Sequence, residues 1–319
     1  MHAVSSAATI FQSYGFNSVA ASVFSEREAP LVVAVEEGSA AAIIPGAIAS
    51  GHCTLLGETL FDYRAPLGSG PASELPAILR TAWSVFFQEQ EKDAGLPFAV
   101  TAARHSSPQL WPGCTPEPFA NAPFIRAGQA SLRSSSLRAQ LRRLLDAGCR
   151  LTVHPGADSS LVRSIYEWKA SQPSGELFRD ALRIEAVTQM ARIARSAGHK
   201  FSEDHSENDA CQIYLLERRT SLVAALVTFR DRQWRRFYST CYHPDWASYS
   251  PGSALLEHVI AQSLAAGLDC DLMTGEQPFK LRFANGSAPL FRMTAPRRTA
   301  RLAAPATSAA DSRLAIIAA

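Results

Sequence analysis

The chain has 319 residues, a length that suits two ordinary domains. Apolar residues make up 47% of it and charged residues 19%, which is enough hydrophobe for sizeable cores and too little charge for a disordered chain. The formal net charge of +2 and the six scattered cysteines argue against a basic nucleic-acid binder, a disulfide-stabilised secreted protein and a zinc ribbon.

Features of membrane proteins are also lacking. The longest apolar run, residues 40–50, is interrupted by Pro45 and Gly46 and is too short to cross a bilayer. Residues 1–24 do not carry the basic n-region of a signal peptide. We therefore expect a cytoplasmic protein with reduced thiols, no membrane insertion and no nucleic-acid partner.

Hydrophobic patterning predicts strands and helices in the first half. Apolar runs at 31–35 and 41–48 flank a polar turn and are typical of a hairpin. The amphipathic segment 134–147 predicts a helix that ends at Gly148. The other predicted elements are a strand at 52–56, a helix at 74–87 capped by Ser73, a strand at 96–102 and an irregular loop at 105–123.

The second half has the order of an α+β domain, with two helices, a three-stranded meander, a helix and two further strands. The predicted elements are a strand at 150–153, helices at 159–170 and 177–197, strands at 211–217, 222–229 and 235–242, a helix at 253–266, and strands at 268–273 and 279–283. The tail, residues 294–319, is rich in Ala, Arg, Ser, Thr and Pro and is predicted to be disordered for most of its length.

One segment is more specific than the rest. It begins with Tyr249-Ser250-Pro251-Gly252-Ser253-Ala254-Leu255-Leu256 and continues through DCDLMTGEQPFKLRF at 269–283. It resembles the signature of the CelD/BcsL family, in which a "ysPG..L" turn opens a helix and the next strand ends in "fD...G.e.yK". Weaker similarity extends upstream to 9–13, 42–45 and 178–180. That family consists of tandem GNAT-like acyltransferases associated with bacterial cellulose and exopolysaccharide synthesis, and it is distantly related to the Fem aminoacyl transferases.

The resemblance implies two GNAT-like domains in tandem, each with a mixed, mostly antiparallel sheet flanked by helices. The implied N-terminal domain is 1–147, the acyl-CoA-binding domain is 148–293, and 294–319 is the tail. The implied reaction moves an acyl group from acetyl-CoA or another acyl-CoA to an amine or a hydroxyl. The expected acceptor is a sugar nucleotide or a saccharide, and a polysaccharide synthase complex is an expected partner.

The glycine turn has a physical reading of its own. Backbone N–H groups at a helix N-terminus can hold a pyrophosphate, and Gly252 and Ala254 would leave that backbone uncovered. The common GNAT pyrophosphate motif begins with Gln or Arg, and Tyr249 occupies that place here. Alternatively, the turn only redirects the chain and caps the helix. The candidate cofactor-binding residues are Tyr242, Pro251, Gly252, Ser253, Ala254 and Leu255.

The candidate catalytic residues follow from the same resemblance. In GNAT folds the strands before and after this helix splay apart around the pantetheine arm, which would make 238–242 and 271–274 its two walls. Asp271 is a carboxylate in an otherwise apolar strand and is a candidate base or orienting group. It could instead be a structural carboxylate, bonded to the turn at 274–275 or paired with Lys280. Lys280 and Tyr249 are candidate contacts for substrate or for a cofactor phosphate.

Two further functions stay open. A Fem-like enzyme would use aminoacyl-tRNA as its donor. A degenerate GNAT protein would act as a non-catalytic scaffold in a synthase complex. The histidines show no metal-ligand spacing, so no metal site is expected. The acyl group, the acceptor and the oligomeric state do not follow from the sequence.

Overall fold

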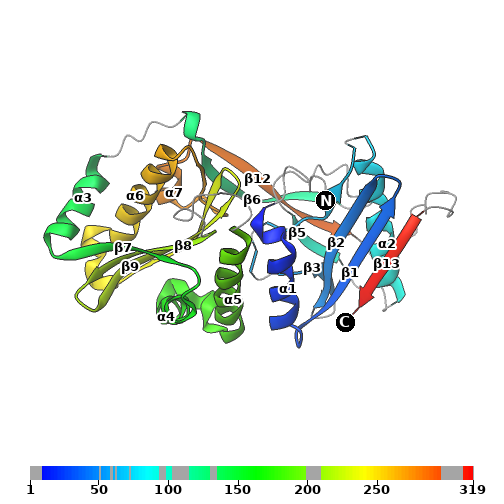
Figure 1. The fold of residues 1–319 in the computed structure, drawn as a ribbon, viewed down its shortest axis with the longest axis horizontal. Coiled ribbons are helices and arrows are strands. Elements are labelled where there is room, and N and C mark those ends of the chain that lie inside the picture. Colours follow the sequence, from blue (N-terminus) through cyan, green and yellow to red (C-terminus); the bar gives the residue numbers. More distant parts are fainter. Residues whose placement is uncertain are drawn as a thin grey trace. The chain divides into compact units, whose positions relative to one another are not determined.

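A computed structural model of the chain describes residues 9–49, 52–57, 60–61, 63–71, 73–92, 98–102, 115–129, 135–198, 210–295 and 312–318. The chain divides into two compact units, Met1–Ala120 with Pro289–Ala319 (unit 1) and Asn121–Ala288 (unit 2) (Figure 1). Unit 2 begins earlier than the sequence-based boundary at 148, because helix α3 packs with the elements that follow it.

Unit 1 is a sheet with helices packed against it. Its elements are η1 (Ile10–Gln12), α1 (Tyr14–Val23), β1 (Glu28–Glu37), β2 (Ala40–Ala49), β3 (His52–Leu55), β4 (Leu67–Ser69), α2 (Leu75–Lys92), β5 (Phe98–Ala102) and β13 (Ser312–Ala318). The strand order is β13-β1-β2-β3-β5-β12, and β4 pairs with β2 outside this path. Strand β12 (Gly286–Ala295) and strand β6 (Thr115–Ile125) contribute residues to both units.

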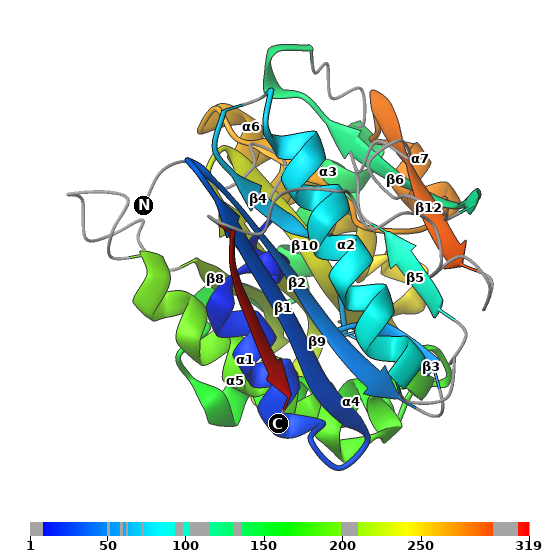
Figure 2. The same cartoon turned by 90° about the vertical axis from the view of Figure 1, so that its right-hand side faces the viewer.

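Helix α2 packs along the sheet of unit 1 (Figure 2). Trp83 and Phe86 are fully buried against the strands, with their ring centroids 5.5 Å apart in an edge-to-face arrangement. Gly46 allows this close approach, since a Cβ there would lie only 2.2 Å from the Phe86 ring. Burying two large aromatic side chains is a major favourable term for this unit.

Unit 2 contains most of the helices. Its elements are η3 (Ala127–Gln129), α3 (Ser135–Asp146), β7 (Cys149–Pro155), α4 (Ser159–Ala170), η4 (Pro173–Arg179), α5 (Ala181–Gly198), β8 (Cys211–Arg218), β9 (Ser221–Asp231), β10 (Trp234–Tyr242), η5 (Pro244–Tyr249), α6 (Pro251–Ala265), β11 (Asp269–Asp271) and α7 (Pro278–Leu281). The strand order is β6-β11-β10-β9-β8-β7. Helices α3 and α6 share one hydrophobic core with β8, β9, β10 and β11.

The two units follow one plan. In unit 2, β7 to β10 are antiparallel neighbours, helix α6 follows β10, and β11 returns parallel to β10 and antiparallel to β6. In unit 1, β13, β1, β2 and β3 form the same antiparallel series, α2 follows β3, and β5 pairs parallel to β3 and antiparallel to β12. The place that β7 holds in unit 2 is held in unit 1 by β13, from the opposite end of the chain.

The predicted α+β fold is confirmed, and most predicted elements of the second half appear within a few residues of their expected ends. Two predictions are wrong. The expected loop at 105–123 is strand β6 from Thr115 onward, and its residues 105–114 lie outside the described part. The expected strand at 279–283 is helix α7, which begins with Pro278 at its first position, where proline is favoured. Within the tail, Ser312–Ala318 forms strand β13 and pairs with β1, whereas 296–311 lie outside the described part. Helix α1 was not predicted.

Candidate functional site

Strands β10 and β11 are paired over a short parallel ladder and then separate. They pair in parallel from Trp234↔Asp269 to Arg236↔Asp271, where β11 ends, whereas β10 continues to Tyr242. Residue Met273 then adopts a left-handed conformation, with φ of 61°, which turns the chain away from the ladder. We call this region, 237–242 of β10 and 271–274, the strand divergence. It includes the segments 238–242 and 271–274, whose role as walls of a pantetheine site stays a prediction.

A β-bulge lies in β10 at the start of the divergence. Phe237 pairs with Thr228 and Ser239 with Val227, so Tyr238 is an extra residue on β10. Side chains alternate between the two faces of a strand, and one extra residue reverses that alternation. Phe237 belongs to the core shared with α6, so the bulge turns Ser239 to the opposite face.

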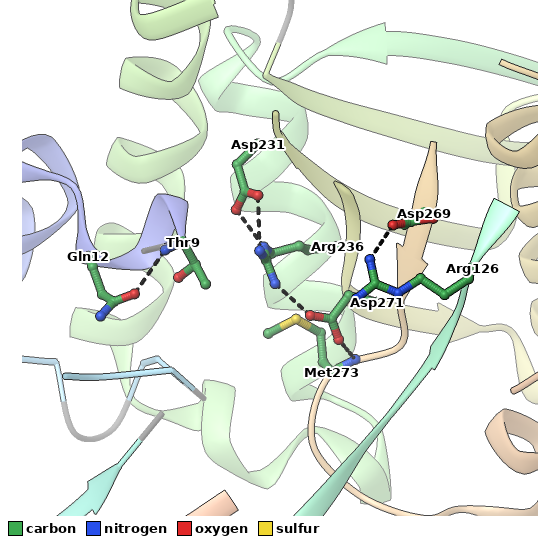
Figure 3. A network of polar contacts seen from close by, with 8 residues as sticks. All are labelled: Thr9, Gln12, Arg126, Asp231, Arg236, Asp269, Asp271 and Met273. Atoms are coloured by element: carbon green, nitrogen blue, oxygen red, sulfur yellow. Dashed lines mark hydrogen bonds and ion pairs between the residues drawn. The ribbon is translucent and has the colours of Figure 1, made fainter. Parts of the chain in front are cut away.

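Asp271 is held on that opposite face. Its carboxylate is fully buried and accepts a hydrogen bond from Arg236 Nη1 at 2.5 Å (Figure 3). Arg236 also forms an ion pair with Asp231. The second Asp271 oxygen accepts the Met273 N–H at 2.9 Å. The carboxylate therefore joins the end of β11 both to β10 and to its own turn, and the sequence reading did not identify Arg236 as its partner.

The second acidic residue of β11 is also paired. Arg126 Nη1 lies 2.6 Å from Asp269 (Figure 3). The other Asp269 oxygen accepts the Ala127 N–H at 2.9 Å. The Arg126 guanidinium stacks over Trp234, 4.4 Å from the ring centroid. Asp269, at the start of β11, is thus bonded within unit 2, as Asp271 is at the end of the strand. The two carboxylates hold β11 at both ends of its short parallel ladder with β10.

Helix α6 begins beside the divergence. Ser250, its N-cap, has a left-handed backbone with φ of 46° and makes no side-chain hydrogen bond to the helix. Pro251 fills the first position, and the Ala254 N–H is bonded to the Ser250 carbonyl. The N–H groups of Gly252 and Ser253 are therefore the early donors that the helix itself leaves open.

Gly252 also packs closely against β10. A Cβ at this position would lie 3.3 Å from Tyr242 Cδ1 and 3.6 Å from Thr240 Oγ1. The side chains of Ala254 and Leu255 are buried in the core of unit 2, which leaves them no free surface for a ligand. Of the predicted cofactor-binding residues, the structure brings Tyr242, Gly252 and Ser253 together at the divergence.

The remaining predicted residues lie in two places. Tyr249 is exposed on η5, with its ring 5.6 Å from that of Trp246. Lys280 lies on α7, and its Nζ donates a hydrogen bond to the Thr274 carbonyl at 2.7 Å. Lys280 therefore reaches the turn that follows β11, at the edge of the divergence.

Lys169 is a residue that the sequence analysis missed. It lies in the last turn of α4, and its Nζ donates to Ser239 Oγ at 2.6 Å and to the Thr240 carbonyl at 3.2 Å. Burial lowers the pKa of Lys169 below its usual range. A signal was present in the sequence, since Lys169 continues the buried stripe formed by Val162 and Tyr166.

Burial also raises the pKa values of other ionisable groups in unit 2. It raises the pKa of Cys241 to about 12, against the opposing effect of Lys169, and raises the pKa of Tyr166 well above its usual range. On the α6 face, burial raises the pKa of Cys270 to about 12. These thiols and the phenol are therefore protonated at neutral pH and are poor proton acceptors.

Two classes of site are not seen in the described residues. None of their His, Cys, Asp and Glu side chains form a group of three or more that could hold a metal ion. None of the helices among them is both long and apolar enough to cross a membrane.

Sequence comparison identifies the class of the domain. Residues 131–281 match the acetyltransferase (GNAT) domain family, a range that includes α3, the meander, α6 and the strand divergence. The fold is therefore GNAT-like, as the resemblance implied, and the domain supports a transferase. The narrower similarity to CelD/BcsL proteins stays a prediction. A search of curated proteins found no significant match.

Solved structures share the fold at low sequence identity. A protein of unknown function from Bacteroides thetaiotaomicron has a TM-score of 0.55 at 10% identity, over 88% of this chain and 90% of its own. FemX has a TM-score of 0.52 at 7% identity, over 91% of this chain and 92% of its own. L-PGS from Bacillus licheniformis has a TM-score of 0.50 at 11% identity, over 88% and 92%. At these identities the likeness concerns the fold alone.

Proposed function

We propose that unit 2 transfers an acyl group from an acyl-CoA to an amine or hydroxyl acceptor. The observation that supports this most is the strand divergence: β10 loses its partner at Arg236, beside a helix whose first turn has no side-chain cap. Beyond Arg236, β10 no longer pairs with β11, and in this proposal a linear donor arm binds along that edge of β10. The uncapped start of α6 offers N–H groups to the anionic end of the same donor.

The residues then have separate roles in this proposal. The N–H groups of Gly252 and Ser253 bind the pyrophosphate, and Tyr242 forms the adjacent wall. Backbone N–H groups of β10 beyond the bulge polarise the thioester carbonyl and stabilise the charge that develops on its oxygen. Asp271 acts as an orienting group, because its contacts with Arg236 and Met273 hold the two strands at the point where they separate. Tyr249 and Lys280 are the candidate contacts for substrate or for a cofactor phosphate.

The acceptor is proposed from the resemblance of residues 249–283. A sugar nucleotide or a saccharide intermediate would accept the acyl group, in the cytoplasm and in association with a polysaccharide synthase. The rival donor is an aminoacyl-tRNA, since FemX shares the fold. The rival function without catalysis is a scaffold. Ligand binding distinguishes all three.

The first experiment is a thermal-shift titration with acetyl-CoA, longer acyl-CoAs and free CoA. A ligand at about 100 times its Kd stabilises the folded state by roughly 2.7 kcal/mol, which moves the melting temperature measurably. We expect a saturable shift that Gly252→Trp abolishes, because the indole would cover the start of α6. Gly128→Trp is the matched control, since a side chain at Gly128 meets nothing within 4 Å.

A shift with CoA that survives in Gly252→Trp would place the donor elsewhere. If no CoA species shifts the melting temperature, the acyl-CoA proposal fails, and charged tRNA and partner proteins become the ligands to test.

A further inference from the structure

The end of helix α4 is tied to β10 immediately beyond the bulge. Lys169 donates hydrogen bonds to Ser239 Oγ and the Thr240 carbonyl, and Gln172 Nε2 donates to the Tyr242 carbonyl at 3.1 Å. Three hydrogen bonds therefore join the end of α4, and Gln172 just after it, to the segment of β10 that β11 has left. They include one ionisable group, the Lys169 amine.

Among the residues that the structure describes, no carboxylate is identified as a partner of that amine. Its two hydrogen-bond acceptors are neutral, and the Phe178 ring lies 5.2 Å from Nζ. None of the ion pairs found among the described residues includes Lys169. Desolvation without a carboxylate partner disfavours the ammonium form and so lowers the pKa of Lys169.

Among the described residues, the ionisable groups on the elements packed against α4 form no identified ion pair with Lys169. On α5, Glu185 pairs with Arg163, two turns before Lys169, and Arg183 lies 3.9 Å from Asp180. Glu176 and Arg179 on η4 are exposed. The nearest further groups are Tyr166 on α4, Tyr238 and Cys241 on β10, and Cys211 on β8. Before the bulge, Arg236 is engaged by Asp231 and Asp271.

The β-bulge is what brings Ser239 to the amine. Without the extra residue Tyr238, position 239 would lie on the α6 face with Phe237, and α4 could not reach it. A helix lysine and a strand hydroxyl are thus brought into contact at the point where the divergence opens. A purely structural contact would not require either a bulge or a desolvated amine.

From this geometry we infer that Lys169 and Ser239 together take the proton from the attacking acceptor during acyl transfer. The inference deepens the proposed function and rests on it. The neutral Lys169 amine accepts the Ser239 hydroxyl proton while Ser239 Oγ receives the proton of the nucleophile. Lys169 and Ser239 are the proton acceptor and its relay, whereas Asp271 only orients the strands.

The step balances in atoms and electrons. The nitrogen or oxygen of the acceptor forms a bond to the thioester carbonyl carbon, and the carbon–sulfur bond breaks with its electron pair on sulfur. The proton lost by the acceptor arrives on Lys169 Nζ through Ser239. The leaving thiolate then takes up one proton, from Lys169 or from solvent, and the products are the acylated acceptor and CoA thiol.

The test begins with the ionisation of Lys169 itself, measured without turnover. The chain contains four lysines, Lys92, Lys169, Lys200 and Lys280, so each can be followed by peptide mass spectrometry. Competitive acetylation with acetic anhydride across a pH series gives the apparent pKa of every amine. We expect Lys169 to titrate well below about 10.4, the ordinary lysine value, with Lys92 and Lys200 as internal references. Saturating CoA should slow the labelling of Lys169 several-fold.

The second arm measures turnover of acetyl-CoA, with glucosamine as the probe acceptor and thiol release as the readout. Lys169→Arg keeps a cation but cannot accept a proton, and we expect kcat to fall on the order of 100-fold, with loss of the acidic limb of the pH profile. Lys169→Met should behave in the same way. Ser239→Ala should lower kcat and keep the limb. Glu167→Gln, an exposed change on the same helix, is the control and should match wild type.

The outcomes separate the two proposals. An ordinary lysine pKa for Lys169, labelling that ignores bound CoA, or full activity in Lys169→Arg each overturns the proton-acceptor role. An unchanged rate in Ser239→Ala overturns the relay. Absence of CoA binding in the thermal-shift experiment overturns the acyl-CoA function instead. Folding of every variant is checked by its melting temperature, and the labelling of wild-type protein decides the question where a variant does not fold.

Discussion

The buried ion pair of Arg236 and Asp271 should be the most sensitive polar contact in unit 2. Arg236 is 3% exposed and Asp271 is 0% exposed, and the Nη1–Oδ2 distance is 2.5 Å. Arg236→Met removes the guanidinium that donates to Asp271 Oδ2 and keeps the hydrogen bond from the Met273 N–H. Removing one partner of a buried pair typically costs about 3–5 kcal/mol, and we expect a loss in that range.

The reverse substitution should cost less. Asp271→Asn leaves Arg236 paired with Asp231, and the amide oxygen can still accept the Met273 N–H. The expected loss is therefore that of one charge-assisted hydrogen bond, about 1.5–3 kcal/mol. The double variant Arg236→Met with Asp271→Asn buries no uncompensated carboxylate and should be more stable than Arg236→Met alone.

Urea unfolding followed by circular dichroism measures these free energies of unfolding. Arg126→Met, which breaks the half-exposed pair with Asp269, is a control from the other end of β11 and should cost less than Arg236→Met. The reasoning is refuted if Arg236→Met costs less than about 1 kcal/mol, or if the double variant is no more stable than Arg236→Met.

Three further predictions concern other parts of the chain. Truncation after residue 311 removes β13 and exposes the edge of β1, so unit 1 should lose stability and the protein should aggregate more readily in light scattering; unchanged behaviour would mean that β13 contributes nothing. Burial lowers the pKa of His258, so the unfolded chain binds a proton that the folded chain does not, and the free energy of unfolding should fall as pH drops below about 6.5. His258→Gln should lose that slope in urea titrations at several pH values, and an equal slope in both proteins would exclude His258 as its source. Asp158→Ala removes the N-cap of α4, where the side chain accepts the Leu161 N–H, and should cost about 1 kcal/mol. Because that hydrogen bond lowers the pKa of Asp158, the difference from wild type should be full at neutral pH and disappear as pH falls below about 3.9; a constant difference would contradict the cap.

Local patterns were sufficient for the elements that bury one regular face. Helix α4 was predicted with its observed ends, because its apolar residues recur at helical spacing between a clear cap and a break. The meander of β8, β9 and β10 was predicted because short turns separate its apolar runs. The α+β fold followed from the same local signals, whereas the GNAT-like segment was identified by its resemblance to a known family.

Elements that depend on distant partners were missed. Strand β13 is stabilised by its pairing with β1, nearly 300 residues away in the chain, and its own composition resembles a disordered tail. Strand β6 contains prolines that suggest a loop, although the Pro123 carbonyl, which proline retains, accepts the Leu272 N–H.

The candidate site likewise has residues that the sequence predicted and contacts that only the tertiary structure reveals. The sequence by itself predicted the glycine turn and Asp271 as candidates, because both belong to one signature within residues 249–283. Only the tertiary structure paired Asp271 with Arg236 and placed Lys169 against Ser239. The residues of these two contacts lie 35 and 70 positions apart in the sequence. A bulge of one residue in β10 decides which face Ser239 occupies, and the energy that favours such a bulge comes from the packing of the whole sheet rather than from local sequence.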